Sequence, residues 1–153
     1  MDEGDRHTEG MSVRRAVLGD AHVDRSIARS TAFTADFQDL ITRYAWGEIW
    51  ARPGLDRRTR SCIALALLVA LRQEEEFGMH VSAALRNGVS PDEIGEVLLQ
   101  CAIYAGVPAA NRAFAVAQDV IDAAAERDTE GGTVGDTVGD TVSEGRDGDD
   151  GHA

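Results

Sequence analysis

Apolar residues recur every three to four positions along most of the chain, which is the spacing of one face of an α-helix. Val13, Val17 and Leu18 form the first stripe of this kind, and residues 33–50 form a longer one. No segment alternates between apolar and polar positions over a length that would indicate a strand. The pattern predicts an all-α domain of six or seven helices over residues 11–128.

Capping and turn residues divide this pattern into separate helices. Asp56 is a typical N-cap for a helix that runs into the apolar stretch 62–71. Because that stretch is apolar on every face, we expect it to be the buried central helix. Gly88 is placed to end the next helix, and residues 90–93, Ser-Pro-Asp-Glu, have the sequence of a capping box. Pro108 opens the last predicted helix.

The two ends of the chain differ in composition from the part between them. Residues 1–10 hold four acids and one Arg with no apolar pattern, and a second Met stands at position 11. Residues 129–153 are rich in Gly, Asp and Thr and contain a short tandem repeat, TVGDTVGDTV. Neither segment offers enough apolar surface to offset the entropy of ordering, so we expect both to be disordered. Met11 is then an alternative start of the chain.

Charge and composition exclude several classes of function. The formal net charge is −12 and most of it comes from the two ends, so the predicted domain is nearly neutral and has no basic stripe for nucleic acid or an anionic membrane. All 15 basic residues are Arg, which excludes Schiff-base catalysis by Lys. No apolar run is long enough to span a bilayer and no signal peptide is recognised, so we expect a cytoplasmic protein. Nucleotide-binding and serine-nucleophile motifs are absent.

The stretch QEEEFGMHVSAALR at residues 73–86 holds the first candidate for chemistry. Glu76 and His80 are four residues apart and share one face of a helix, whereas Glu74 and Glu75 can face water. The pair is either an ordinary surface pair or a partly buried carboxylate–imidazole pair, in which the carboxylate raises the pKa of the imidazole. A metal site is not indicated, because the spacing supplies no further ligands.

Two other stretches are candidate anion sites. Arg57, Arg58 and Arg60 begin a helix, where the helix dipole disfavours cations. Three roles are open for these residues: binding a carboxylated ligand, pairing with the acids of a neighbouring subunit, or facing solvent. Residues 104–112, YAGVPAANR, place the N-terminus of a helix beside Asn111, which indicates either an anion site or only a tight turn.

Several segments together resemble one known family: WGEIWARPGLDRRTRS, LALLVAL, AALRNGVSPDEIGEVLLQ and YAGVPAANRAF. The chain is similar to the carboxymuconolactone decarboxylase family from about Val13 to Ile121, nearly the whole predicted domain. The resemblance implies an all-α bundle of the alkyl hydroperoxide reductase D-like type that assembles into a ring-shaped homo-oligomer, a hexamer or a trimer. It also implies decarboxylation of 4-carboxymuconolactone to 3-oxoadipate enol-lactone and CO2 in the breakdown of protocatechuate, with no cofactor and no metal.

The same resemblance gives roles to the candidate residues. The family substrate is a butenolide whose quaternary ring carbon bears a carboxylate and an acetate arm, and its own ring accepts the electrons that CO2 leaves behind. His80 would donate the proton, and Glu76 would orient the His80 ring and favour its positively charged form. Arginine would hold the carboxylates, a polar group would donate to the lactone oxygen, and aromatic rings would form an apolar wall. The candidates for holding the carboxylates are Arg58, Arg60 and Arg112. The candidates for donating to the lactone oxygen are Tyr104, Asn111 or the helix end at Pro108. The apolar wall would be Trp46 with Trp50.

Two other functions stay open. Peroxide-reducing members of the superfamily use a Cys-x-x-Cys ahead of the His, but Gln73 and Glu76 stand at those positions here, and Ser61 stands near the position of their proton-relay Glu. Cys62 and Cys101 lie far apart in apolar runs, as small buried hydrophobic residues do. A non-enzymatic helical assembly module is the other alternative.

Overall fold

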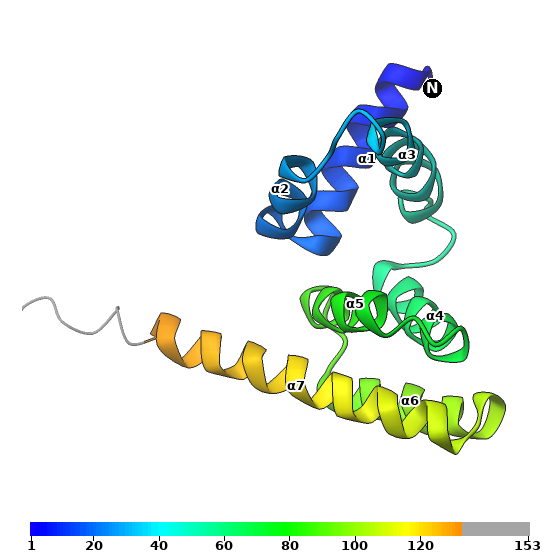
Figure 1. Cartoon of the computed structure of the whole chain (residues 1–153), viewed down its shortest axis with the longest axis vertical. Coiled ribbons are helices and arrows are strands. Elements are labelled where there is room, and N and C mark those ends of the chain that lie inside the picture. The colour runs from blue at the N-terminus through cyan, green and yellow to red at the C-terminus, as the bar shows by residue number, and fades with distance from the viewer. Residues whose placement is uncertain (133–153) are drawn as a thin grey trace, which may run out of the picture.

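The computed structural model describes residues 1–132, and within that range it consists of helices and connecting turns without a strand (Figure 1). The helices are α1 (Glu3–Leu18), α2 (Asp20–Ala28), α3 (Ala35–Leu40), the π-helix η1 (Ile41–Trp50), α4 (Arg57–Ala70), α5 (Glu74–Arg86), α6 (Pro91–Ala105) and α7 (Val107–Gly132). The all-α prediction is confirmed for these residues. None of the helices is long and apolar enough to cross a membrane.

The helices form two halves that meet at α5. The N-terminal half consists of α1, α2, α3 and η1, and the C-terminal half of α4 to α7, with α5 lying against α1 (Figure 1). One core cluster fills the C-terminal half around Leu65 and Leu98, and a smaller one joins the halves through Val17, Trp46 and Ala83.

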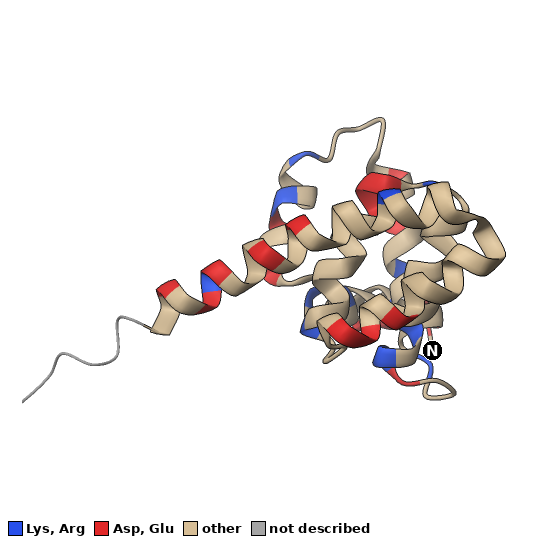
Figure 2. Ribbon diagram, turned by 90° about the horizontal axis from the view of Figure 1, so that it is seen from below, with Lys and Arg blue, Asp and Glu red and all other residues tan. Residues whose placement is uncertain are grey.

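The last turns of α7 project beyond the bundle and carry successive acidic residues (Figure 2). Residues 129–132, which the sequence led us to expect as part of a disordered tail, belong to this helix. The other positions of the predicted tail, 133–153, lie outside the described residues.

Local signals in the sequence set several helix boundaries. The Asp56 side chain caps α4 by accepting a hydrogen bond from the backbone N–H of Thr59 at 2.7 Å. Ser90 and Glu93 form the predicted capping box at the start of α6. Gly88 follows α5 with a φ of 87°, a left-handed conformation that glycine adopts without strain. These predictions are confirmed, because each depends on residues within one turn of each other.

The prediction that residues 1–10 are disordered is wrong, because residues 3–10 form the first turns of α1. This segment has no apolar stripe, and polar contacts with η1 hold it in place. Glu3 binds the guanidinium of Arg43, and Arg6 donates a hydrogen bond to Glu48 at 3.1 Å. The partners lie about forty residues away in the sequence, so no local pattern could reveal them.

The backbones of α1 and η1 approach so closely that glycine is required on both helices. A Cβ atom added to Gly10 would lie 1.9 Å from the carbonyl oxygen of Thr42, and one added to Gly47 would lie 2.3 Å from the carbonyl oxygen of Arg6. A larger side chain at either position would force the backbones apart. This contact fixes η1, which carries Trp50 as its last residue. π-Helical turns are rare and are frequent at functional sites.

The prediction that α4 is buried on every face is wrong for a single chain. Leu65 is fully buried, but Ile63 and Leu67 are exposed, Leu67 to 56%. The neighbouring helix α6 exposes Ile103 to 82% and Tyr104 to 85%. The two helices therefore present an apolar surface that one chain leaves uncovered. A continuous apolar pattern cannot distinguish burial within a chain from burial against another chain.

Candidate functional site

His80 lies on α5 where this helix meets the N-terminal half. Its ring stacks on Trp50 of η1, with 6.1 Å between the ring centroids and 20° between the ring planes. Trp50 in turn contacts Trp46, with 5.3 Å between their centroids. The tight packing of α1 on η1 holds this aromatic pair in place. The predicted apolar wall and the predicted proton donor are therefore in contact.

Burial decides the charge of His80 in the free protein. It lowers the pKa of the imidazole below its usual range, and a charge on His22 lowers this pKa further. The Nδ1 atom of His80 is buried and has no hydrogen-bond partner among the described residues. Because an unperturbed histidine titrates near pH 6.5, His80 is mostly neutral at pH 7.

The predicted contact between Glu76 and His80 does not form. Glu76 is exposed, and no hydrogen bond joins the two side chains within residues 1–132. The prediction that Glu76 raises the pKa of His80 is wrong, because that pKa is lowered. The charge of Glu76 acts on His22 instead, where it opposes the lowering of the pKa by burial and by Arg25.

Of the three arginines predicted to hold carboxylates, Arg60 is the one beside the aromatic pair. It lines a cavity of about 200 Å³ together with Trp50 and four apolar side chains. One guanidinium nitrogen of Arg60 donates to the carbonyl oxygen of Arg52 at 3.2 Å. The Nε atom of Arg60 is buried and has no partner among the described residues, so part of its donor capacity is unused.

Arg58 and Arg112 are engaged with acids of the same chain. Arg58 binds the Glu93 carboxylate and the carbonyl oxygen of Gly88, which joins the start of α4 to the start of α6. Arg112 donates to Glu74 at 2.9 Å and joins α7 to α5. Both contacts connect helices, so the structure gives these two residues a structural role that the sequence did not predict.

Tyr104 and Asn111 lie near the turn between α6 and α7, and both are exposed. Tyr104 lines a groove between α4 and α6 of about 530 Å³, which we call the α4–α6 groove. Neither residue lines the cavity beside Trp50. Within one chain, the structure therefore does not bring these two predicted residues together with His80.

The thiols lie in an environment that suppresses their reactivity. Cys62 and Cys101 are free and both line the α4–α6 groove. Burial raises the pKa of each thiol, which disfavours the thiolate that peroxide chemistry requires. Ser61, near the position of the peroxidase relay Glu, is buried and accepts a hydrogen bond from Asn87 at 2.9 Å. These features argue against the peroxide-reducing alternative.

The contribution of α2 to the site was missed by the sequence analysis. His22 lies on this helix, close enough to His80 for its charge to affect the pKa of His80. It lines a polar cavity of about 300 Å³, here called the α2 cavity, whose walls are His22, Arg25, Ser26, Arg29, Ser30, Thr34 and Gln38. No three potential metal ligands cluster anywhere in residues 1–132. The fold of the N-terminal half brings α2 to α5, and no local motif indicates this.

The fold and the site together define a class: an all-α protein with a half-buried histidine against a tryptophan wall and, in its described part, no redox pair of cysteines. The chain belongs to the Carboxymuconolactone decarboxylase family, whose model matches residues 35–119. The matched segment includes the aromatic pair of η1 and His80.

Individual relatives agree with this assignment. The chain is 48% identical over 120 residues to the 4-carboxymuconolactone decarboxylase of Acinetobacter baylyi (strain ATCC 33305 / BD413 / ADP1), covering 78% of this chain and 90% of that protein. It is 42% identical over 114 residues to the nitrosuccinic acid decarboxylase npaB of Metarhizium robertsii (strain ARSEF 23 / ATCC MYA-3075), covering 74% of this chain and 80% of that protein. A 4-carboxymuconolactone decarboxylase sequence of Pseudomonas putida is 56% identical over 48 residues, which are 31% of this chain and all of that sequence.

Proposed function

We propose that this chain catalyses the loss of CO2 from 4-carboxymuconolactone to give 3-oxoadipate enol-lactone, a step in the breakdown of aromatic compounds. The observation that carries the proposal is the half-buried His80 stacked on Trp50, in a chain 48% identical to a 4-carboxymuconolactone decarboxylase over 90% of that protein. A proton carrier beside an apolar wall is what this reaction requires of a protein.

The substrate supplies its own electron acceptor. When the bond between the quaternary ring carbon and its carboxylate breaks, CO2 leaves and the electron pair moves through the ring C=C into the lactone carbonyl. The result is a dienolate, and a proton added to the carbon next to the carbonyl completes the enol-lactone. The protein therefore places the lactone, stabilises the dienolate oxygen and delivers one proton.

His80 delivers this proton in the proposed mechanism. It is mostly neutral in the free protein, but the substrate carries two negative charges, and a nearby anion raises the pKa of an imidazole. Substrate binding therefore favours the imidazolium form, with the proton taken from water. Trp50 covers the imidazole and keeps water from the dienolate. Arg60, in the cavity beside Trp50, donates to the lactone oxygen as negative charge develops there.

The substrates of the relatives share a chemical unit. The Metarhizium robertsii protein is by its name a decarboxylase of nitrosuccinic acid. Nitrosuccinic acid and 4-carboxymuconolactone each contain a succinate unit, in which one carbon bears a carboxylate and a CH2–COO⁻ arm. In nitrosuccinic acid this carbon carries the electron-accepting nitro group. In the lactone it is attached to the ring C=C, which leads to the electron-accepting carbonyl. We propose that this chain recognises the succinate unit, and that the lactone ring takes the place of the nitro group as electron acceptor.

A direct assay tests the proposed function. Purified protein is mixed with authentic 4-carboxymuconolactone, and formation of the enol-lactone and of CO2 is followed by chromatography and by trapping of the gas. Nitrosuccinate is the second substrate, and the lactone that lacks the ring carboxylate is the control. Absence of turnover with 4-carboxymuconolactone refutes the proposal, and faster turnover of nitrosuccinate assigns the chain to that reaction instead.

The proposed role of His80 predicts a particular pH dependence. Only the protonated imidazole can donate, so kcat/KM should fall as pH rises through the pKa of the free protein, which burial holds below about 6.5. The fall in kcat should occur at higher pH, because the bound dianion raises the pKa of His80. Steady-state rates between pH 5 and 9 measure both curves. Coincident profiles for kcat and kcat/KM would contradict the proposed effect of the substrate.

We further propose that the chain functions as a homo-oligomer, with a hexamer or a trimer as the expected form. The α4–α6 groove and the exposed apolar residues around it support this proposal. Monomeric proteins rarely leave contiguous apolar patches of this kind in water. The residues concerned are Ile63, Leu67, Leu71, Leu99, Ile103, Tyr104 and Val107.

Ile103→Asp is expected to shift the protein to a monomer of 16.4 kDa, because a carboxylate buried in an apolar interface is strongly unfavourable. Sedimentation velocity measures the mass of the assembly for the variant and the wild type. Leu55→Asp, at an exposed apolar position in the turn before α4, is the matched control and should leave the assembly intact. Wild-type protein that sediments as a monomer at micromolar concentration would refute the oligomer.

A further inference from the structure

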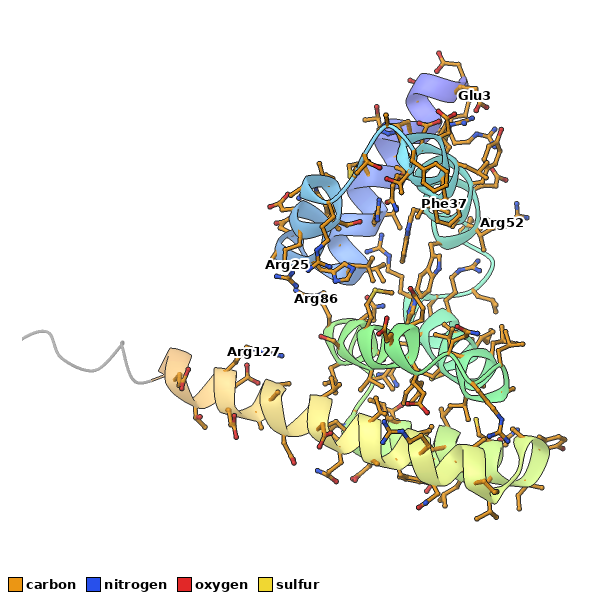
Figure 3. All side chains as sticks on the ribbon, in the orientation of Figure 1. Glu3, Arg25, Phe37, Arg52, Arg86 and Arg127 are labelled. Atoms are coloured by element: carbon orange, nitrogen blue, oxygen red, sulfur yellow. The ribbon has the colours of Figure 1, made fainter. Side chains whose placement is uncertain are left out.

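The α2 cavity has the composition of an anion site. Its lining contains Arg25, Arg29 and His22, together with hydroxyl and amide side chains, and no acid. Its volume of about 300 Å³ is at the lower end of the range for small-molecule pockets. Arg25 extends from α2 on the side that faces the end of α5 (Figure 3). The proposed reaction so far gives this cavity no function.

A buried guanidinium lies behind the wall of the α2 cavity. Arg14 of α1 is only 5% exposed. It donates to Ser26 Oγ and Gln38 Oε1, each at 3.0 Å, and both of these side chains line the cavity. Its third acceptor is Thr42 Oγ1 at 3.2 Å. All three acceptors are neutral, so they hold the guanidinium in place without balancing its charge.

The positive charge of Arg14 is therefore uncompensated in the described structure. Within residues 1–132 the hydrogen bonds of Arg14 go to neutral side chains and not to a carboxylate, and its buried Nε atom has no hydrogen-bond partner there. Burial lowers the pKa of its guanidinium, as expected for a cation removed from water without a counter-charge. Buried charges in proteins are normally paired, so an unpaired one beside a cavity indicates that an anion binds in that cavity.

We propose that the α2 cavity binds the carboxylate that the substrate retains, the one on its CH2–COO⁻ arm. This inference rests on the proposed decarboxylation. The retained group is charged in substrate, transition state and product, so arginines can hold it without opposing the reaction. The carboxylate that leaves becomes neutral CO2, and cations around it would stabilise the ground state more than the transition state and slow its loss. The cationic cavity therefore suits only the retained group.

The position of the cavity fits this assignment. His22 lines the cavity and also acts electrostatically on His80, so the cavity and the proposed proton donor are neighbours. Arg86, at the end of α5, lies against Gly19 at the start of α2, where an added Cβ would be 2.6 Å from its guanidinium. A substrate anchored by its arm in the α2 cavity can thus extend toward α5, with its ring directed to His80 and Trp50.

Binding of succinate tests the assignment without relying on turnover. Titration calorimetry compares succinate with its neutral diamide, for the wild type and for the double variant Arg25→Gln/Arg29→Gln. Both arginines are exposed, so the double variant should fold normally. The pair Arg72→Gln/Arg127→Gln removes the same charge at exposed positions away from the cavity and serves as the control. Inorganic phosphate is the second probe, for attraction by charge alone.

We expect the wild type and the control pair to bind succinate equally, and the double variant to bind it at least tenfold more weakly. With the lactone, the double variant should raise KM at least tenfold and change kcat far less, because the anchor holds substrate and transition state alike. Equal succinate binding by the wild type and the double variant would overturn the assignment. The assignment would also be overturned if the control pair lost as much succinate affinity as the double variant. The same holds if the wild type bound the diamide or phosphate as tightly as it binds succinate.

The outcomes also separate this inference from the proposed function. If the wild type decarboxylates the lactone and the double variant keeps its KM and its succinate affinity, the decarboxylase proposal stands and the α2 cavity is not the anchor. If the wild type does not turn over the lactone, the decarboxylase proposal fails. Selective loss of succinate binding in the double variant would then still identify the cavity as a carboxylate site.

Discussion

Replacing His80 with Gln is expected to lower kcat for 4-carboxymuconolactone by about a hundred- to ten-thousandfold, because positioned general acids contribute about that much to rates. Gln has a similar length and remains polar, so the contact with Trp50 and the packing around α5 should change little. The effect should therefore appear in kcat far more than in KM. Steady-state kinetics of the purified variant measures both parameters.

Glu76→Gln is the matched control for this experiment. Glu76 lies one turn away on the same helix, but it is exposed and does not contact His80. We expect a change in kcat of a few-fold at most, through the effect of its charge on His22. If His80→Gln retains wild-type kcat with an unchanged circular dichroism spectrum, another group donates the proton. An equally large loss in Glu76→Gln would restore the carboxylate–imidazole pair that the helical spacing suggested.

Gly47→Ala is expected to lower the free energy of unfolding by about 1–2 kcal/mol. A methyl group at this position would lie 2.3 Å from the carbonyl oxygen of Arg6, and a rigid backbone cannot yield as a flexible side chain can. Overpacking of this kind costs about 1–3 kcal/mol. The better helix propensity of Ala returns at most about 1 kcal/mol. Gly10→Ala should behave in the same way, since its contact with Thr42 is closer still.

Urea unfolding followed by circular dichroism measures these differences. Gly54→Ala is the control, because no atom lies within 4 Å of the added methyl group. It should leave stability unchanged or raise it slightly, by reducing the entropy of the unfolded chain. A Gly10→Ala variant as stable as the wild type would mean that residues 3–10 do not pack against η1, as the sequence alone first suggested.

The parts of the fold that the sequence predicted correctly are those governed by near neighbours. The cap at Asp56 and the capping box at Ser90 each depend on a few adjacent residues, and both occur. The first turns of α1 were missed because Glu3 and Arg6 are held by partners in η1. The exposure of Leu67 was missed because a hydrophobic pattern does not show which chain provides the cover.

The candidate site follows the same division. His80 and the aromatic wall were identified from the resemblance of extended segments, and the structure places His80 on Trp50. The four-residue spacing to Glu76 guaranteed a shared helix face but not contact, and burial together with the charge of His22 lowers the pKa of His80. The α2 cavity was missed because its lining joins α2, the turn after it and α3 in a way that no helical pattern shows, and the buried Arg14 behind it comes from α1. One local signal existed: Arg14 stands between the buried Val13 and Val17, where an apolar stripe would not normally admit a charge.

If the α2 cavity holds the substrate carboxylate as proposed, the buried guanidinium of Arg14 also links the lifetime of the protein to the supply of its substrate. An occupied α2 cavity gives this charge a counter-ion, so the folded state is stabilised by whatever fills the cavity. A ligand that binds only the folded chain adds about 2.7 kcal/mol of stability when its concentration is a hundredfold above its Kd. Melting temperature and resistance to proteolysis should therefore rise while lactone is abundant. A cell degrading aromatic compounds would thereby protect this protein from turnover during the period in which it is needed.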